Sequence, residues 1–564
     1  MNLADLLDRA ERWMAADPDP DTRAHMGMFI DAARRGGPGS RAAADLAARF
    51  TGPLAFGTAG LRGPIGAGES RMNVAVVIRA TAGLMAWLNA QIEQPRVVIG
   101  CDARYGSRAF AEAAAEVVSG AGGIALTLPP CQPTPLTSFS VKALDADAGI
   151  MVTASHNPGG DNGYKVYTGG RVAAEGGAGV QIIPPADSEI SQAISEVGPA
   201  ALVPRDFERI QPVDTREKYV ARAAALAEPG DVRIALTPMH GVGAELAVTT
   251  LRAAGFEAVS VVPQQAKPDP TFPTVSFPNP EEAGALDLAK AHATSIDADI
   301  IVALDPDADR CAVCAPEGDG WRQLSGDELG LILGDYRARR ASEEGRHGVL
   351  ATSIVSTRGL AAVARSWGMD YASTLTGFKW IARVPDVLFG FEEAIGYCPD
   401  PQAVADKDGI ATAVLVASVA AGLKAQGRTL LDALDDVACR VGAFRTRPLV
   451  FRVSDQSLIA GGMARLREHA PSHLGGQPVT QVVDLSTGYE GLPPTDGMLL
   501  MTQGDSRVVV RPSGTEPKLK CYLEAHEAAP EDADQAWARA TWPVLDARLD
   551  ALARDVAQAT GFAQ

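Results

Sequence analysis

The amino-acid sequence predicts an α/β protein of three similar α/β domains with mainly parallel sheets, followed by a smaller C-terminal α+β domain. Up to about residue 445, short apolar segments alternate with Gly- or Asp-rich turns and Ala-rich segments. Apolar strands that alternate with helices are typical of parallel sheets covered on both faces. The pattern then changes to short strands, Met498–Gln503 and Ser506–Pro512, and a helical tail from Pro530 onward.

Six apolar segments are expected to be strands of the α/β domains: Arg96–Gly100, Ala148–Ala154, Arg233–Pro238, Ala298–Leu304, Gly348–Val355 and Asp386–Phe391. Ligands of parallel sheets bind beyond the carboxyl ends of the strands. The unusual polar residues of this sequence come directly after these segments. We therefore expect the functional site at the carboxyl edges of the sheets.

The 564 residues exceed the usual domain size of roughly 100 to 200 residues, so several domains are expected. Stretches with Pro or several charges, near Pro204–Arg205, Trp321–Asp327 and Arg445–Arg447, are plausible joints. The predicted parts are a helical N-terminal extension (1–50), three α/β domains (51–205, 206–324 and 325–446) and the α+β domain (447–564).

Composition excludes several classes of partner. The net charge of −18 argues against nucleic acid and anionic membranes, although local Lys and Arg clusters still allow a small anionic substrate. Met1–Trp13 lacks the apolar core of a secretory signal, and no run of about 18 apolar residues predicts a membrane span. The seven cysteines are scattered, and Cys311 and Cys314 lack further ligands at zinc spacing. We expect reduced thiols and a cytoplasmic location.

Two motifs follow apolar strands and carry reactive groups. In Thr153–Pro158, Ser155 lies at the end of a strand, where it can act as an exposed nucleophile; the alternative is a polar turn that caps a helix. Asp305, Asp307 and Asp309 alternate, so in an extended segment their carboxylates share one face. Three adjacent carboxylates need a cation, and oxygen ligands suit Mg²⁺. The alternatives are a solvated acidic loop and a calcium-like turn.

Three further motifs are suited to phosphate or sugar groups. Arg511–Lys518 combines an Arg, hydroxyls and Gly514, a set that fits an anion but also a surface turn. Glu392 and Glu393 enter a Gly turn and can accept hydrogen bonds from sugar hydroxyls. Leu375–Lys379 precedes these acids, Asp406–Gly409 follows them as a helix start, and Phe56–Gly63 holds three glycines and an Arg.

Taken in order, Thr153–Pro158, Asp305–Arg310 and Arg511–Lys518 resemble the α-D-phosphohexomutase superfamily, and most closely its bacterial phosphoglucomutase and phosphomannomutase branch, which has phosphopentomutase-type relatives. The resemblance runs from about Phe56 to Tyr522, and the extension with Trp13 looks like the same branch. It implies four domains around a central cleft and an isomerase that transfers phosphate within its substrate.

The resemblance also implies residue roles. Ser155 matches the phosphorylated serine, and Asp305, Asp307 and Asp309 match the ligands of one Mg²⁺ per chain, with a phosphoserine oxygen as a further ligand. The residues expected around the transferring phosphate are Arg62, His156, Lys165 and Arg310. Those expected to bind substrate are Thr376, Gly377, Lys379, Glu392, Glu393, Lys407, Arg511, Ser513, Gly514 and Thr515.

The implied reaction converts a hexose 1-phosphate into a hexose 6-phosphate, with a hexose 1,6-bisphosphate as intermediate and activator. Lys165 or His156 would carry the proton, and the fourth domain would close as a lid. Many hexomutases have Ser and His where this sequence has Ile395 and Tyr397, so the preferred sugar stays open. A phosphopentomutase acting on ribose phosphates is the main alternative, ahead of a phosphatase or an inactive sugar-phosphate-binding protein. A monomer and a homodimer both remain open.

Overall fold

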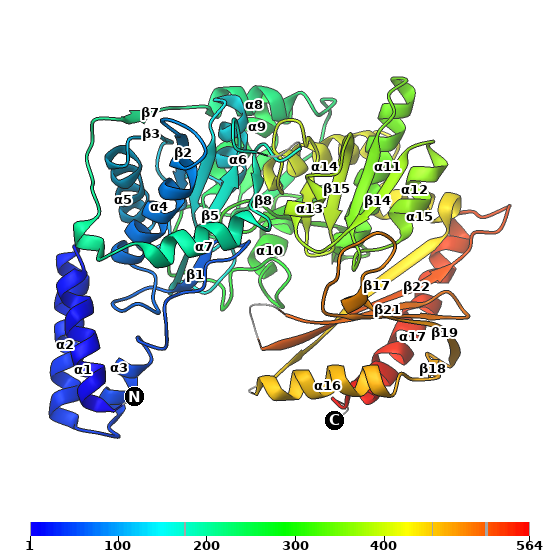
Figure 1. Ribbon diagram of the computed structural model, residues 1–564. Helices are drawn as coiled ribbons and strands as arrows, with labels where there is room; N and C mark the ends of the chain where they lie inside the picture. The colour runs from blue at the N-terminus through cyan, green and yellow to red at the C-terminus, as the bar shows by residue number, and fades with distance from the viewer. Residues whose placement is uncertain (1, 174–175, 454, 514–516, 563–564) are drawn as a thin grey trace. The chain divides into compact units, whose positions relative to one another are not determined.

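The computed structural model describes residues 2–173, 176–453, 455–513 and 517–562. The chain divides into two compact units. The first consists of Met1–Cys314 and Gly396–Ser418, and the second of Ala315–Ile395 and Val419–Gln564. Figure 1 labels most helices and strands of both units.

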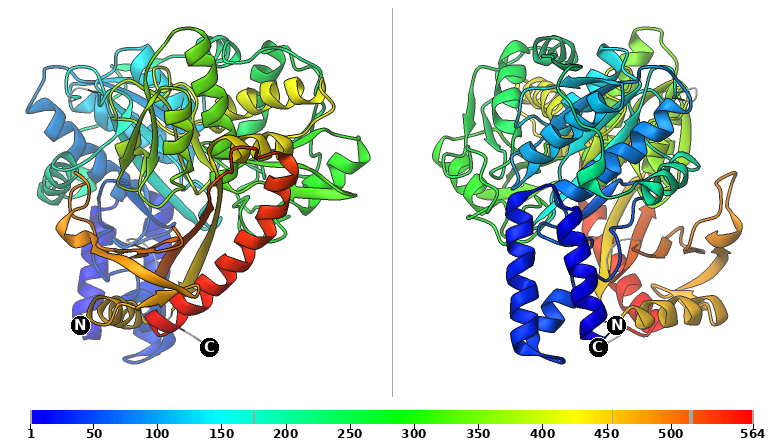
Figure 2. Two further views of the ribbon diagram at one scale, coloured as in Figure 1. Left: turned by 90° about the vertical axis from the view of Figure 1, so that its right-hand side faces the viewer. Right: turned by 60° about the vertical axis from the view of Figure 1, so that its left-hand side comes forward.

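The first unit begins with three helices, α1 (Leu3–Ala16), α2 (Pro20–Gly36) and α3 (Arg41–Ala47). Side chains of Asn2, Asp19 and Ser40 accept hydrogen bonds from amides in the first turns, which explains where the helices begin. Figure 2 shows α1 and α2 side by side in blue. Their shared core consists of buried apolar residues, among them Leu6, Ala10, Met26, Ile30, Leu46 and Phe50.

The first sheet has the order β1-β5-β4-β2-β3-β7, with β6 paired to β5. Its strands are β1 (Leu61–Pro64), β2 (Arg96–Cys101), β3 (Ile124–Thr127), β4 (Ala148–Val152), β5 (Asp161–Thr168), β6 (Val180–Gln181) and β7 (Ile210–Pro212). The pairs β2/β4, β2/β3 and β3/β7 are parallel, whereas β5 runs antiparallel to β4 and β1. Its helices are α4 (Val74–Asn89), α5 (Ser107–Gly120), α6 (Thr134–Ala143), α7 (Ala186–Glu196) and the short η1 (Ala200–Leu202).

Four neighbouring strands of the second sheet are β8 (Ile234–Thr237), β9 (Val259–Val261), β10 (Ile300–Leu304) and β11 (Cys311–Glu317), in the order β11-β10-β8-β9. The pairs β10/β8 and β8/β9 are parallel, and β11 runs antiparallel to β10. The helices of this part are α8 (Arg216–Ala224), α9 (Gly243–Ala253) and α10 (Asp287–Ser295). Every residue of β10 is buried, as expected for a central strand.

The second unit contains a parallel set of strands, β13 (Val349–Ser353) between β14 (Asp370–Thr374) and β15 (Val387–Glu392). Its helices are α11 (Gly326–Glu343), α12 (Gly359–Ser366), α13 (Phe378–Ile381) and α15 (Leu430–Val441), and β12 (Gly320–Gln323) precedes α11. The strand β16 (Gly396–Cys398) and the first part of α14 (Gly409–Lys424) belong to the segment counted with the first unit.

The C-terminal part of the second unit is an antiparallel sheet in the order β17-β22-β21-β20-β19-β18. Its strands are β17 (Ala443–Arg452), β18 (His473–Leu474), β19 (Gln477–Asp484), β20 (Met498–Thr502), β21 (Arg507–Pro512) and β22 (Lys518–Glu527). The helices α16 (Gln456–Glu468) and α17 (Gln535–Thr560) pack on this sheet, and the short η2 (Leu485–Thr487) follows β19.

The predicted fold class is confirmed, with three sheets that are parallel in their centres and one antiparallel sheet at the end of the chain. The strand predicted to reach Ala154 ends at Val152, because the Thr153 side chain accepts the amide of Ser155 and turns the chain. The C-terminal helix begins at Gln535 rather than Pro530, since Asp534 caps it. No described helix has the length and apolar character to cross a bilayer.

One buried acid in the second unit affects stability. Asp327 lies in the first turn of α11 and is buried. Its carboxyl accepts hydrogen bonds from the Thr357 amide (2.8 Å) and the Thr446 hydroxyl (2.7 Å). Burial raises the pKa of Asp327 to about 7, although both hydrogen bonds act in the opposite direction.

The free energy of unfolding should therefore respond to Asp327→Asn in a pH-dependent way. Between about pH 4 and pH 7 the carboxyl of Asp327 is ionised in the unfolded chain but stays protonated in the folded protein. The contribution of Asp327 to the free energy of unfolding therefore falls as pH rises through this range. We expect the variant to gain about 1 to 3 kcal/mol relative to wild type at pH 8 compared with pH 4. Urea unfolding across this range measures the difference. The exposed Asp370→Asn is the control, and equal pH slopes for Asp327→Asn and wild type would contradict the prediction.

Candidate active site

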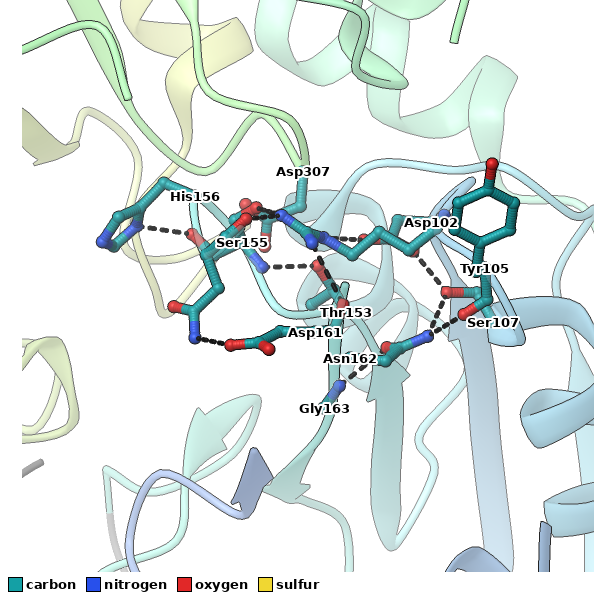
Figure 3. A network of polar contacts seen from close by, with 12 residues as sticks. Asp102, Tyr105, Ser107, Thr153, Ser155, His156, Asp161, Asn162, Gly163 and Asp307 are labelled. Carbon is teal, nitrogen blue, oxygen red and sulfur yellow. Dashed lines mark hydrogen bonds and ion pairs between the residues drawn. The ribbon is translucent and has the colours of Figure 1, made fainter. Parts of the chain in front are cut away.

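Ser155 lies in a tight turn between β4 and β5. Its side chain is buried, and its φ of +49° places a non-glycine residue in the sparsely populated left-handed region. The Ser155 amide donates to the Thr153 hydroxyl (2.9 Å), and the Asn157 amide donates to the Ala154 carbonyl (3.0 Å). The Ser155 hydroxyl donates to Asp305 Oδ2 (2.9 Å). It also lies 3.2 Å from His156 Nδ1, a contact that Figure 3 shows.

The three aspartates follow β10, and one oxygen of each lies within 4.8 Å of the others. All three are fully or almost fully buried. The segment is a turn with Ala308 at φ +54°, so the extended conformation assumed for the alternating acids is wrong, although their carboxylates do converge. Gly409 at the start of α14 touches this turn, because a Cβ there would lie 2.4 Å from the Arg310 carbonyl oxygen.

Cationic side chains surround the carboxylates. Lys165 Nζ on β5 lies 2.8 Å from Asp307 Oδ2 and 3.0 Å from Asp309 Oδ2. Lys407 Nζ lies 3.2 Å from Asp309 Oδ2, and Arg310 Nε lies 3.8 Å from Asp309 Oδ1. The antiparallel pairing of β5 with β4 places Lys165 opposite Met151, close to the Ser155 turn.

The aspartates of this cluster differ in how readily they ionise. Burial raises the pKa of Asp305 well above its usual value, and the charges of Asp307 and Asp309 add to this. Burial acts on Asp307 as well, but Lys165 holds the pKa of Asp307 below its usual range. Asp307 Oδ1 and Asp309 Oδ1 are buried and accept no hydrogen bond from the described residues. Buried carboxylate oxygens of this kind fit a hard metal cation.

Arg62 and His156 complete this group. Arg62 on β1 is exposed and donates to the Asn157 side-chain oxygen (3.2 Å). Burial lowers the pKa of His156 well below its usual value, and the positive charges of Arg310 and Arg62 lower it further, so the imidazole is neutral at pH 7. The first unit therefore brings together every site residue that the sequence predicted within it: Arg62, Ser155, His156, Lys165, Asp305, Asp307, Asp309, Arg310 and Lys407.

The other predicted residues lie in the second unit. The Gly377 amide donates to Glu392 Oε1 (2.6 Å), and Gly377 has a φ of +112°. Arg511 on β21 donates to the Thr376 hydroxyl, which joins the predicted phosphate-binding segment to the Leu375–Lys379 segment. Lys379 is half-buried in α13, and the Ser513 amide donates to the Lys518 carbonyl (2.9 Å). Gly514 and Thr515 lie outside the described residues.

Glu393 is held by a residue that the sequence analysis missed. The Ser356 hydroxyl donates to Glu393 Oε2 (2.8 Å). Arg507 donates to the Ser356 carbonyl (2.5 Å) and the Ile354 carbonyl (3.0 Å), so β21 supports the loop that orients Glu393. Ser356 follows β13, and the rule that polar residues after a strand mark a site could have found it.

Two further residues were missed in the first unit. Thr134 at the start of α6 donates its hydroxyl to Asp307 Oδ2 (2.6 Å) and its amide to the Asp307 carbonyl (2.9 Å). Arg104 donates to backbone carbonyls around Ser155. Arg104 follows β2, so the same rule could have found it, whereas no sequence signal distinguishes Thr134 from other helix-start residues.

Models of the phosphoglucomutase/phosphomannomutase family match four consecutive parts of the chain. The alpha/beta/alpha domains I, II and III of this family match residues 53–199, 217–318 and 325–439. Its C-terminal domain matches residues 491–536. The matches contain Ser155, the three aspartates, Glu393 and Arg511.

Two relatives and one solved structure are similar over most of their length. A Haemophilus influenzae protein named "Probable phosphomannomutase" is 43% identical over 474 residues, which cover 83% of this chain and 96% of the relative. The phosphopentomutase of Mus musculus is 34% identical over 584 residues, covering 92% of this chain and 90% of the relative. A phosphoglucomutase/phosphomannomutase family protein from Burkholderia thailandensis, 19% identical, shares the fold with a TM-score of 0.68 over 90% of this chain and 98% of that one. The resemblance seen in the three motifs is confirmed, and the chain belongs to the phosphoglucomutase/phosphomannomutase family.

Proposed function

We propose that this protein is a phosphosugar mutase of the phosphoglucomutase and phosphomannomutase type. It interconverts a hexose 1-phosphate and a hexose 6-phosphate through phosphorylated Ser155 and a hexose 1,6-bisphosphate, which also serves as activator. The observation that carries the proposal is the Ser155 hydroxyl, which donates to Asp305 at the edge of the buried carboxylate cluster. Membership of a mutase family and the 43% identical relative named as a phosphomannomutase support it.

We assign one Mg²⁺ per chain to Asp305, Asp307 and Asp309, with an oxygen of phosphorylated Ser155 as a further ligand. The carboxylates are hard oxygen ligands, and two of their buried oxygens accept no hydrogen bond from the described residues. When bound, the ion supplies positive charge next to the phosphoryl oxygens, where phosphoryl transfer needs it most.

In the first transfer, the bond between phosphorus and Ser155 Oγ breaks and a bond to the free sugar hydroxyl forms. That hydroxyl loses its proton, Ser155 Oγ takes one up, and the second transfer reverses these steps at the other phosphate. Neutral His156, 3.2 Å from Ser155 Oγ, can accept a proton. Burial disfavours the charge of Lys165, yet Asp307 and Asp309 raise the pKa of Lys165, which therefore stays protonated and can donate. Arg62 and Arg310 add positive charge around the transferring group.

Recognition of the rest of the substrate belongs to the second unit in this proposal. Glu392 and Glu393, with Thr376, Gly377 and Lys379, bind the sugar. Arg511 and Ser513, with Gly514 and Thr515, bind the phosphate that does not react. The direct bond between Arg511 and Thr376 supports a joint role for the two loops. Lys407, which lies 3.2 Å from Asp309, contributes from the first unit.

A phosphopentomutase is the second candidate. The mouse phosphopentomutase covers 92% of this chain at 34% identity, and Ile395 and Tyr397 replace the Ser and His of many hexomutases. A coupled assay with glucose 1-phosphate, mannose 1-phosphate and ribose 1-phosphate, each with a trace of the matching bisphosphate, tests both. We expect a higher kcat/KM for a hexose phosphate. A preference for ribose 1-phosphate would overturn this choice of sugar but leave the mutase chemistry intact.

The proposed partner is a small phosphosugar, with no nucleic acid and no membrane involved. The net charge of −18 supports this, since polyanions and anionic lipids would repel the protein. We further propose that the enzyme works in the cytoplasm as a monomer or homodimer.

Ser155→Ala should abolish mutase turnover, because the variant lacks the hydroxyl that carries the phosphoryl group in the proposed mechanism. The fold should persist, because within the described part of the chain the side chain bonds to Asp305 and His156 alone. The coupled assay and a thermal melt on the same preparation measure both. Ser138→Ala, which removes another buried serine hydroxyl, is the matched control and should keep its activity. Retention of more than about a tenth of wild-type kcat by Ser155→Ala would refute the covalent route.

Removal of divalent metal should stop turnover, and Asp307→Asn should raise the Mg²⁺ concentration needed for half-maximal activity at least about tenfold. The loss of one carboxylate charge weakens a cation site built from three. Activity titrations and calorimetry with Mg²⁺ measure the two effects. The control is Asp297→Asn, which removes an exposed surface charge and should change neither. Full activity in excess chelator would rule out the metal assignment.

Arg511→Ala should lower kcat/KM roughly ten- to more than a hundredfold in both directions, from the about 1.5 to 3 kcal/mol of a charge-assisted Arg–phosphate contact. Arg511→Lys should recover part of this, because an ammonium cannot reproduce the planar fork. Ser155 should still be phosphorylated in the intact mass. Arg447→Ala, which breaks a surface ion pair with Asp550, is the control. A loss of Tm with normal kinetics would instead mark Arg511 as a structural residue.

A further inference from the structure

Arg104 lies next to the Ser155 turn and donates hydrogen bonds to the backbone of that turn. It belongs to the loop between β2 and α5, and its side chain is only 2% exposed. Its Nη2 donates to the carbonyls of Ser155 (2.6 Å) and Asn157 (2.5 Å). Its Nη1 donates to the carbonyls of Pro158 (2.8 Å) and Asp161 (3.1 Å). The four N–H groups at the end of the guanidinium therefore serve one turn.

The loop that holds Arg104 is itself tightly bonded. Asp102 Oδ1 accepts the Arg104 amide (2.9 Å) and the Ser107 hydroxyl (2.5 Å), and Asp102 Oδ2 lies 3.5 Å from Arg104 Nε. Asn162 on β5 donates to the Ser107 hydroxyl (2.9 Å) and to the Tyr105 carbonyl (2.8 Å). Figure 3 shows these bonds of Asp102, Ser107 and Asn162 beside the Ser155 turn. Asp102 thus provides a fixed, buried counter-charge for Arg104.

The bonds of Arg104 explain an otherwise costly conformation. Ser155 at φ +49° is unfavourable for a residue with a side chain, and inward-facing carbonyls need donors when they are buried. Arg104 supplies these donors to four carbonyls of the turn. The Ser155 hydroxyl of the same turn reaches Asp305 at 2.9 Å. Fixed donors to the backbone of the turn thus restrain where the Ser155 oxygen lies.

Arg104 differs from the arginine expected at the phosphate. Arg62 is exposed, and its described bond to the turn goes to the Asn157 side chain. The terminal N–H groups of Arg104 are already used by carbonyls, and the Phe272 ring lies 5.0 Å from its guanidinium carbon. Arg104 is therefore placed to hold the turn and has no terminal donor left for a phosphoryl group.

We propose that Arg104, with Asp102 as its counter-ion, is a positioning residue that holds the Ser155 turn in the conformation in which the Ser155 oxygen meets the carboxylate cluster. The inference rests on the proposed phosphoserine chemistry of Ser155. A shift of about 1 Å in a reacting group can cost about a hundredfold in rate, so the loss of these four bonds should act mainly on kcat.

The test is Arg104→Lys in the full-length protein, assayed with glucose 1-phosphate, a trace of glucose 1,6-bisphosphate and Mg²⁺. We expect kcat to fall about thirty- to a hundredfold with KM changed less than about threefold, because an ammonium cannot reach four carbonyls from one plane. The rate at which glucose 1,6-bisphosphate phosphorylates Ser155, followed by intact mass, should fall in parallel. Arg104→Ala should lose more, and added methylguanidinium should restore part of its rate.

The chain contains a matched control in Arg171. Its guanidinium donates to the carbonyls of Glu93 (3.1 Å) and Gln94 (3.3 Å) and pairs with Asp147, as Arg104 does with Asp102, but it makes none of its described bonds to the Ser155 turn. Arg171→Lys should lower Tm while kcat and the phosphorylation rate stay at wild-type values.

The outcomes separate this inference from the proposed function. Without turnover or Ser155 phosphorylation in the wild type, the proposed function fails first and the inference with it. If the wild type is active, three results for Arg104→Lys would overturn the inference and leave the proposed function intact. These results are a normal kcat, an increase in KM alone, and a lower Tm alone, as expected for Arg171→Lys. Failure of both Arg104 variants to fold would likewise overturn it in favour of a purely structural role.

Discussion

The burial of three carboxylates in one turn is the constraint on which the first unit depends. Asp305, Asp307 and Asp309 have oxygens within 4.8 Å of one another and almost no exposure to water, so their mutual repulsion must be offset locally. Lys165 and Lys407 supply part of that charge at 2.8 to 3.2 Å. The antiparallel strand β5 that carries Lys165 also follows the Ser155 turn, so the pairing of β4 with β5 brings a cation close to Ser155.

In the second unit, arginine side chains hold the loops in place, partly through backbone carbonyls. Glu393 is held through Ser356, and Arg507 on β21 holds the Ser356 carbonyl at 2.5 Å. Arg511 on the same strand donates to Thr376. The strand that carries Arg511 therefore also holds the loop that orients Glu393. A substitution that moves β21 should displace both Ser356 and Thr376, because one strand carries both of the arginines that bond to them.

The sequence predicted most of the fold, and the reasons are local. The strand at Ala298–Leu304 was predictable because a short, continuous apolar segment between helices is typical of a parallel strand that is buried on both faces. The helix at Gly409 was predictable from the acids before it. Strand ends were less certain: β4 stops at Val152 because Thr153 turns the chain through its own side chain. The aspartate turn was read as extended, since the spacing of the acids does not show that Ala308 adopts φ +54°.

The sequence by itself predicted the main site residues, since Ser155 and the aspartates come directly after apolar strands, and their motifs together with the Arg511 motif resemble one superfamily. Only the tertiary structure decided which residues support them. Thr134 bonds Asp307 across 173 positions of sequence, and Arg104 bonds the Ser155 carbonyl across 51. Supporting side chains of this kind need only a donor group within hydrogen-bond distance of its acceptor. Thr and Arg are common residues, and folding alone brings donor and acceptor together, so the sequence does not mark them.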